Sequence, residues 1–226
     1  MSKVVLFGTG RGADVAYRFL TKDTNHEIVG FTVDEKYMKS RELKGLPLVP
    51  FEEVERHYPP EDFRLYILLG YQQMNGLRQR KYEIAKGKGY TLESYVASGI
   101  FQVEPIVVGE NCFILDNQSI SLDVTIGNNV VAWSSNHIGD LSTIKDHAWL
   151  ASHVTIAASV TVEENVFLGV GATVATNVTL GAGSFIGANA LASNDVAPNS
   201  VHVASGEPID VDARAFMRIM TMNKKL

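Results

Sequence analysis

The chain of 226 residues lacks several features that would place it in a common class of protein. It has one cysteine, Cys112, so no intrachain disulfide can form, and no apolar run reaches the roughly 20 residues of a membrane span. The net charge of −5 provides no basic footprint for DNA, RNA or an anionic membrane. The N-terminal residues do not resemble a secretory signal peptide. We therefore expect a cytoplasmic protein with no nucleic-acid or membrane partner, whose cysteine is a buried structural thiol.

An aliphatic residue recurs at every sixth position through the second half of the chain. Neither a helix nor an ordinary strand has this period, whereas a coil of short strands does, with three hexads closing one turn of a prism. Among the fourteen positions only Ala132 is not Val, Ile or Leu. The series consists of Val108, Ile114, Ile120, Ile126, Ala132, Ile138, Ile144, Leu150, Ile156, Val162, Leu168, Val174, Leu180 and Ile186.

A second register with period six contains mostly small or β-branched residues. It predicts a second inward position near each corner of the prism: Cys112, Val124, Val130, Ser142, Ala148, Val154, Val160, Val166, Ala172, Val178, Ser184 and Ala190. Gly often follows the aliphatic position, and we expect it to relieve strain where the backbone bends. A β-sandwich with coincidental spacing is the alternative, but its strands would alternate with period two. The pattern favours a β-helix that is stabilised by stacking of its repeats.

The first hundred residues show strands alternating with helices. Residues 3–7, 27–33 and 64–70 read as strands, with a weaker one at 91–95. Helices are expected over 13–21 and 74–86. This alternation predicts a small, Rossmann-like parallel α/β sheet.

Ligands of such sheets bind beyond the carboxyl ends of the strands. The candidate substrate-binding residues at that edge are Gly8, Gly10, Arg11, Asp34, Gly70, Tyr71, Asn75 and Arg78. The Gly8-x-Gly10-x-Gly12 loop is suited to a phosphate at a helix N-terminus, Asp34 to a ribose or base, and Arg78 to a phosphate. The glycine spacing is not a full dinucleotide fingerprint, and a simple strand–helix turn with solvated charges explains it equally well. Because the sheet is half-sized, we expect at most one mononucleotide and no nicotinamide cofactor.

The two halves together resemble the hexapeptide-repeat sugar acyltransferases that include sialic-acid O-acetyltransferase and bacillosamine N-acetyltransferase. The resemblance rests on Phe7-Gly8-Thr9-Gly10, Gly70-Tyr71 with Met74-Asn75 and Arg78, Asn136 to Gly139, Phe167 to Ala172, and Ser205 to Pro208. It implies a left-handed β-helix, a homotrimer, acetyl-CoA as co-substrate and a nucleotide sugar on the N-terminal domain. The implied reaction is acetylation of a sugar amine or hydroxyl, in bacterial-type glycan biosynthesis. The implied cofactor-binding residues are Ala157, Ala158, Gly169, Val170 and Gly171, and no metal is expected.

The chain departs from the family where the catalytic base is expected. Aligning the repeats places Asp140, followed by Leu141, at the position of the usual His, and His137 lies three residues earlier. Three hypotheses follow. His137 is the base, with Asp140 fixing its tautomer; or Asp140 takes the proton, or a reactive amine needs little help; or the protein binds ligand without acetylating it.

Two further histidines follow inward positions by three residues. His147 and His153 are therefore expected to point outward at equivalent sites on successive sides. His153, sixteen residues after His137, is a further substrate-binding candidate one turn away. A histidine packed at a trimer seam is at least as good an interpretation for both.

These observations predict an α/β domain over residues 1–98, a β-helix over 99–206 and a C-terminal capping tail with a short amphipathic helix over 207–226. The expected function is acetyl transfer, and the rival function is that of an inactive trimeric scaffold. A hexapeptide-type carbonic anhydrase is a third class, which would require a metal triad that the sequence does not visibly provide.

Overall fold

The computed structural model describes residues 2–204 and 212–222. Contacts between residues divide the chain into two compact units. The first unit comprises Met1–Gly70 and Arg80–Tyr95, and the second comprises Tyr71–Gln79 and Val96–Leu226. The chain thus enters the second unit for nine residues, 71–79, before it returns to complete the first.

The first unit is the expected α/β sheet, with strand order β3-β4-β2-β1-β5. The expected strands are present, and two that the sequence did not reveal extend one edge: β4 is parallel to β2, and β3 is antiparallel to β4. The strand expected at 91–95 is reduced in this unit to a single parallel bridge between Leu65 and Leu92. The strands are β1 (Lys3–Phe7), β2 (Glu27–Val33), β3 (Glu42–Leu43), β4 (Leu46–Pro50) and β5 (Arg64–Ile67). The helices are α1 (Arg11–Asp23), η1 (Glu35–Tyr37), η2 (Phe51–Glu53), α2 (Val54–His57) and α3 (Gly76–Gly87), the last of which continues from the second unit into the first.

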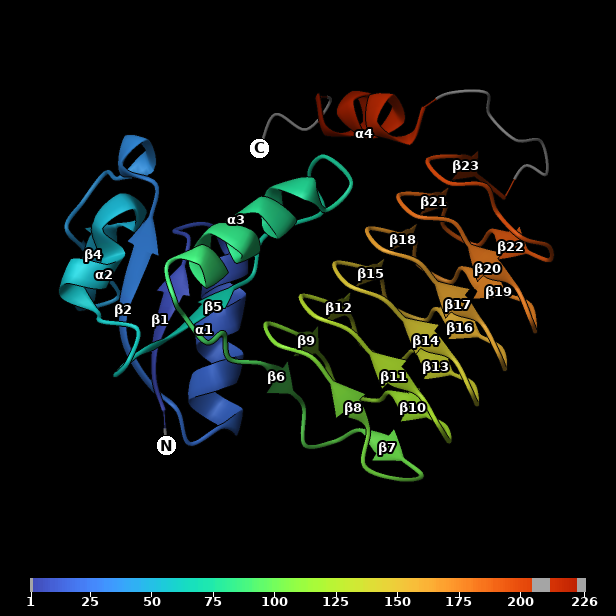
Figure 1. Ribbon diagram of the computed structural model, residues 1–226, viewed down its shortest axis with the longest axis horizontal. Helices are drawn as coiled ribbons and strands as arrows, with labels where there is room; N and C mark the ends of the chain where they lie inside the picture. The colour runs from blue at the N-terminus through green and yellow to red at the C-terminus, as the bar shows by residue number, and fades with distance from the viewer. Residues whose placement is uncertain (1, 205–211, 223–226) are drawn as a thin grey trace. The chain divides into compact units, whose positions relative to one another are not determined.

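The second unit is a left-handed parallel β-helix with three sides, whose coils are stacked from β7 to β23 in Figure 1. We name each side after its outward residues. The aromatic side comprises β6 (Tyr95–Val96), β9 (Phe113–Ile114), β12 (Val131–Ala132), β15 (Trp149–Leu150), β18 (Phe167–Leu168), β21 (Phe185–Ile186) and β23 (Val201–His202). The histidine side comprises β7 (Phe101–Gln102), β10 (Ser119–Ile120), β13 (His137–Ile138), β16 (Thr155–Ile156), β19 (Thr173–Val174) and β22 (Leu191–Ala192). The threonine side comprises β8 (Val107–Val108), β11 (Thr125–Ile126), β14 (Thr143–Ile144), β17 (Thr161–Val162) and β20 (Thr179–Leu180).

The core of the β-helix confirms both inward registers. Every expected aliphatic position from Ile114 to Ile186 is buried, and Val108 is half-buried against the same cluster. The small register is also buried throughout, including Cys112, Ser142 and Ser184. The Cys112 thiol donates a hydrogen bond to the carbonyl of Gly127, which gives it a structural environment.

The corners of the β-helix also follow a period of six, in a way that the sequence did not reveal. From residue 111 to residue 189, every sixth residue has a positive φ, between 55° and 69°. Asn is the commonest residue there, because its short side chain tolerates the left-handed conformation. The series consists of Asn111, Asn117, Asp123, Asn129, Ser135, Leu141, His147, His153, Ser159, Asn165, Gly171, Asn177, Gly183 and Asn189.

The glycines that follow the aliphatic positions do not have the role that we expected. Gly139 and Gly169 have no positive φ, so they relieve no bend. Instead, a Cβ atom on Gly139 would lie 2.7 Å from the carbonyl carbon of Ala157, and one on Gly169 would lie 2.6 Å from the Ala188 nitrogen. Successive coils approach too closely at these points for any side chain.

The C-terminal segment forms the expected helix, α4 (Ala213–Met222). The carboxylate of Asp212 accepts the N–H groups of Arg214 and Ala215 and so caps its N-terminus. The N–H of Ala213 donates to the carbonyl of Asn199 in the final coil, and the Phe216 ring lies 5.1 Å from that of Phe185. The start of α4 therefore packs on the last coils, while the Ser205 to Pro208 block lies outside the described residues.

Candidate active site

The carboxyl edge of the α/β sheet contains a strand–helix turn built for close backbone approach. Gly8 has a φ of +108° and Gly10 caps α1 without a side-chain hydrogen bond, so no side chain covers the first N–H groups of the helix. A Cβ atom on Gly12 would lie 2.1 Å from the carbonyl oxygen of Leu68, so only glycine lets α1 pack against the end of β5. Arg11, the first residue of α1, is exposed. This arrangement is suited to an anion at the helix N-terminus.

Asp34 has a partner that the sequence analysis did not identify. Its carboxylate forms an ion pair with the Lys81 ammonium, and both side chains are largely buried. The ammonium also lies 5.4 Å from the ring centroid of Phe7 and 5.2 Å from that of Phe51. Lys81 follows β5 by fourteen residues and lacks a motif, which explains why sequence reasoning missed it. It places a cation beside Asp34 within the first unit.

Arg78, expected to bind a phosphate, donates hydrogen bonds to main-chain carbonyls of the β-helix. Its guanidinium is fully buried and reaches the carbonyl oxygens of Asn129 at 3.1 Å and His147 at 2.7 Å. It also donates to the carbonyl of Ala148, and it lies 5.5 Å from the ring centroid of Trp149. These contacts join two successive coils to the 71–79 segment.

Asn75 is anchored at the same corner of the β-helix. Its amide donates to the carbonyls of Asn165 and Val166, and its oxygen accepts a hydrogen bond from Arg78. Gln73, Met74 and Asn75 all have positive φ values, between 51° and 63°. Three consecutive left-handed residues other than glycine are strained, at a cost of about 1–2 kcal/mol each. The buried anchor at Asn75 and Arg78 therefore holds a turn that the local sequence disfavours.

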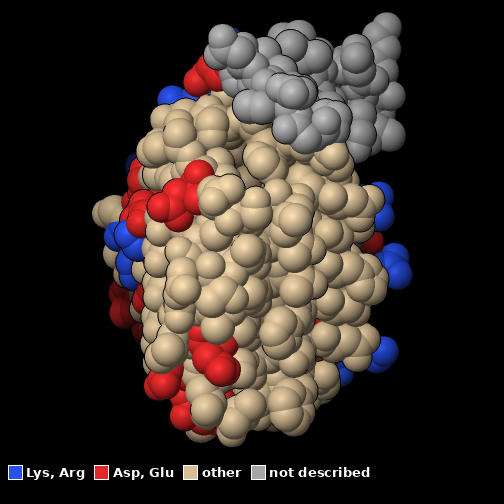
Figure 2. Space-filling view, turned by 90° about the vertical axis from the view of Figure 1, so that its right-hand side faces the viewer, with Lys and Arg blue, Asp and Glu red and all other residues tan. Residues whose placement is uncertain are grey.

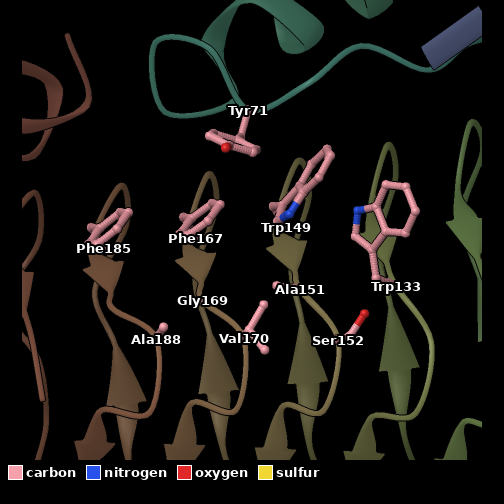
Figure 3. Close-up of a pocket in the computed structure, with 10 residues that line it drawn as sticks. All are labelled: Tyr71, Trp133, Trp149, Ala151, Ser152, Phe167, Gly169, Val170, Phe185 and Ala188. Carbon is pink, nitrogen blue, oxygen red and sulfur yellow. The ribbon is translucent and has the colours of Figure 1, made fainter. Parts of the chain in front are cut away.

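This strained turn places Tyr71 opposite the aromatic side of the β-helix. Its ring lies 5.2 Å from that of Trp149 and 4.9 Å from that of Phe167. A pocket of about 490 Å³ lies there, as Figure 3 shows. It is lined by Tyr71, Trp133, Trp149, Ala151, Ser152, Phe167, Gly169, Val170, Phe185 and Ala188. Two expected cofactor-binding residues, Gly169 and Val170, therefore meet Tyr71 at one site.

The remaining expected cofactor-binding residues lie at corners of the β-helix. Gly171, with a φ of +69°, occupies the left-handed position next to Val170. The carbonyl oxygen of Ala157 accepts a hydrogen bond from the Ser142 hydroxyl. Ala158 is the next residue, two positions after the inward Ile156. Val170 holds the corresponding position after Leu168.

The main-chain N–H groups of Ala158 and Val170 differ in their hydrogen bonding from the N–H groups of several residues at equivalent positions of the repeat. At three other positions this N–H donates to a side chain one coil further on: Asn128 accepts from Glu110, Asp146 accepts from Asn128, and Asp140 accepts from Leu122. An acidic or amide side chain thus covers the equivalent N–H group at those positions.

The residues one coil after Ala158 and Val170 are neither acidic nor amides. Ala188 follows Val170 and has no side-chain acceptor, whereas Thr176 follows Ala158 and carries a hydroxyl. Within the described residues the Thr176 hydroxyl does not accept from Ala158, and neither N–H donates to a carbonyl. Both N–H groups are therefore available to an acceptor on a ligand.

His137 lies outward and exposed in β13, on the histidine side. Its Nδ1 lies 3.4 Å from the Ser119 hydroxyl, and no hydrogen bond to Asp140 is present in the described part of the chain. The expectation that Asp140 fixes the His137 tautomer thus finds no direct contact, and Ser119 takes that position. Thr155, rather than His153, pairs with His137 in the next coil. His153 is exposed at the preceding corner, with a φ of 61°.

Asp140 is engaged in hydrogen bonds of its own. The Ser121 hydroxyl and the Leu122 N–H donate to its carboxylate and, with the nearby His137, hold the pKa of Asp140 below its ordinary value. A carboxylate with a lowered pKa is a weaker proton acceptor at neutral pH.

His147, expected to point outward, is buried at a corner of the β-helix. Its Nδ1 lies 2.9 Å from the amide nitrogen of Asn129, and the amide oxygen of Asn129 accepts a hydrogen bond from Asn111 at 2.8 Å. The three side chains form a ladder up one corner of the β-helix. Among the described residues no cluster of three or more His, Cys, Asp or Glu side chains is arranged to hold a metal.

Comparison with known proteins first identifies the type of repeat in the second unit. The family model for the bacterial transferase hexapeptide, of six repeats, matches residues 159–192. The prediction of a hexapeptide-repeat protein is confirmed. No curated protein matches the chain by sequence.

Solved structures then match both units at low identity. Perosamine N-acetyltransferase from Caulobacter crescentus, in complex with CoA and GDP-perosamine, is 21% identical with a TM-score of 0.77, covering 93% of this chain and 98% of that chain. The acetyltransferase domain of PglB from Neisseria gonorrhoeae is 14% identical, and WeeI from Acinetobacter baumannii is 13% identical. Each of these two has a TM-score of 0.77 and covers 92% of this chain and 100% of its own. The likeness confirms the fold of an α/β domain followed by a left-handed β-helix. The described residues contain no helix with the length and hydropathy of a membrane span.

Proposed function

We propose that this protein is an acyl-CoA-dependent acyltransferase that acetylates an amine or hydroxyl of a nucleotide-linked sugar. The observation that carries the proposal is the pair of main-chain N–H groups at Ala158 and Val170, which have no partner among the described residues, on a β-helix of the transferase type. Such groups can bind the cofactor or the developing oxyanion of the thioester carbonyl. Acetyl-CoA is the co-substrate that fits best, since the similar perosamine and PglB structures contain CoA and acetyl coenzyme A.

In the proposed reaction the acceptor loses its proton as it attacks the thioester carbonyl. The carbon–sulfur bond breaks, a carbon–nitrogen or carbon–oxygen bond forms, and the departing CoA thiolate receives a proton. His137 is the better candidate for the base, because it is exposed and its Nδ1 is held near Ser119. Asp140 is a weaker candidate, because its hydrogen bonds lower its pKa.

The nucleotide part of the acceptor would occupy the α/β edge, with phosphate at the Gly8 to Arg11 turn and ribose or base near Asp34 and Lys81. Gly70 lies three residues beyond the end of β5. Asn75 and Arg78 would act as positioning residues for Tyr71, since their polar atoms contact main-chain carbonyls.

A homotrimer is part of the proposal. The outward ladder of the threonine side runs Val107, Thr125, Thr143, Thr161 and Thr179 and carries no charge. Figure 2 shows that the surface at the right-hand side of Figure 1 also has broad areas with few charged side chains, of the kind that pack against another copy. His153 lies at the corner between the aromatic and histidine sides, away from this surface, and is proposed as a contact of the acceptor.

Thiol release from acetyl-CoA, measured against a panel of nucleotide-linked amino sugars and free sialic acid, tests the proposal. We expect turnover with one acceptor, and a fall in kcat of roughly 10²–10⁴-fold in His137→Ala with little change in KM for acetyl-CoA. His57→Ala, at an exposed site in the first unit, is the matched control and should retain full activity.

A binding protein without activity is the second candidate, favoured by one observation: Asp140 stands where the family has its base and is occupied by Ser121 and Leu122. Absence of thiol release, together with a rise in melting temperature on addition of CoA or a nucleotide sugar, would establish that function instead.

A further inference from the structure

The pocket beneath Tyr71 is unusually apolar for a site that handles sugars. Its lining includes five aromatic residues, and none of the ten described lining residues is charged. Figure 3 shows Trp133, Trp149, Phe167 and Phe185 in a row along successive coils, with Tyr71 across from them. The polar side-chain groups in the lining are the hydroxyls of Tyr71 and Ser152 and the two indole N–H groups.

A sugar ring fits this lining poorly. It has a hydroxyl or amine on most of its carbons, and each that is buried without a partner costs binding free energy. An apolar chain needs no such partners, and burial of its methylenes against aromatic rings is favourable. The lining therefore favours an aliphatic occupant over the acceptor sugar.

The position of the pocket relative to Val170 indicates which aliphatic group that would be. Val170 and Gly169 line the pocket, and the Val170 N–H has no partner among the described residues. A thioester carbonyl bound by that N–H would leave its acyl chain against the aromatic row. An acetyl group has three heavy atoms and would fill on the order of 90 Å³, if each takes about the volume of a liquid water molecule. The pocket holds about 490 Å³.

We propose that the aromatic pocket is an acyl-chain site and that, in addition to acetyl-CoA, the protein takes longer acyl-CoA donors with four to six carbons in the acyl group. This inference rests on the proposed acyl-CoA function and names its donor class. Tyr71 is then a specificity residue that touches the chain. Asn75 and Arg78 hold it in place through the strained turn at Gln73 to Asn75.

Binding affinities of a donor series test this proposal on the full chain. CoA, acetyl-CoA, butyryl-CoA and hexanoyl-CoA are titrated by calorimetry, and tryptophan emission is recorded in parallel. The chain has two tryptophans and both line the pocket, so emission reports occupancy there. We expect Kd to fall about fourfold for each added methylene, and emission to change more with hexanoyl-CoA than with CoA.

A matched pair of variants locates the site. Ala188→Leu narrows the pocket, and we expect it to abolish the gain in affinity that butyryl and hexanoyl groups give over acetyl. Ala182→Leu places the same side chain at the equivalent position of the preceding hexad, outside the pocket, and should keep the full series.

Equal Kd values for acetyl-CoA and hexanoyl-CoA would overturn the proposal, as would a nucleotide sugar that alone perturbs tryptophan emission when the acyl-CoAs do not. Failure of the proposed function is distinguishable, because it would appear as no acyl transfer from any donor. A Kd series that still depends on chain length would then support the acyl-chain site independently. Conversely, turnover of acetyl-CoA with a flat Kd series would refute only the longer donors.

Discussion

The aromatic and threonine sides of the β-helix share one core and differ in everything that faces away from it. Their inward residues are aliphatic and fully buried in both cases, as at Leu168 and Val162. Outward, the aromatic side carries rings that are also buried, such as Phe167 at 8% exposure, whereas Thr161 and its neighbours remain partly exposed. The inward register therefore specifies the coil, and the outward ladder specifies what packs against each side.

The largest expected effect is a difference in the free energy of unfolding between a substitution in the aromatic ladder and one in the threonine ladder. Phe167→Ala removes a ring that stacks 4.8 Å from Phe185, and we expect it to lower the free energy of unfolding by about 3 kcal/mol. Thr161→Ala at the corresponding outward position of the threonine side should change it by less than about 0.5 kcal/mol. Urea unfolding of both variants measures the contrast. Equal losses would mean that the aromatic ladder has no structural role beyond that of the threonines.

The second effect tests whether the buried Arg78 side chain holds the 71–79 segment, and with it Tyr71, on the aromatic side of the β-helix. Arg78→Met keeps much of the side-chain volume but leaves carbonyls of Asn129, His147 and Ala148 without this donor. We expect a loss of about 2 kcal/mol in unfolding free energy.

The control for Arg78→Met is Arg56→Ala, which removes an exposed arginine paired with Glu53 and should be nearly neutral. If both variants unfold at the same urea concentration, Arg78 does not anchor the segment.

The smallest effect concerns the corner at Leu141, between the histidine and threonine sides. Leu141 has a φ of 60° and is 61% exposed, so a bulky apolar side chain occupies the left-handed position where Asn is common. We expect Leu141→Asn to stabilise the protein by about 1 kcal/mol, visible as a higher melting temperature. Leu122→Asn is the matched control at an exposed leucine without positive φ, and it should give no gain. A gain in both variants would point to removal of apolar surface rather than to relief of strain.

The sequence predicted what depends on local periodicity. The inward registers, the strands near Val5 and Phe31 and the turn at Gly8 follow from residue spacing alone, and all are present. Four features of the structure depend on contacts between residues far apart in the chain, which the local spacing of residues does not predict. These are the carbonyl contacts of Arg78, the Asp34–Lys81 ion pair, the ladder through His147, and the pocket formed where Tyr71 meets Phe167.

The glycines after the aliphatic positions show how one pattern can have two physical causes. The spacing of Gly139 and Gly169 marks both as constrained, but the constraint is the neighbouring coil and not their own φ. A glycine that is required for a positive φ and a glycine that is required because a Cβ atom would clash look the same in the sequence. Only the packing of the coils distinguishes them.

The pairing of each residue with one eighteen positions later, as in Trp149 with Phe167 and His137 with Thr155, behaves like a reading frame. An insertion of eighteen residues would add a whole coil and keep every outward ladder on its own side. An insertion of six would preserve the buried core but shift all later ladders by one side, so that aromatic rings would continue the histidine side and threonines would continue the aromatic side. Changes in the length of this protein are therefore expected to be tolerated in whole coils, much as a gene tolerates insertions in whole codons.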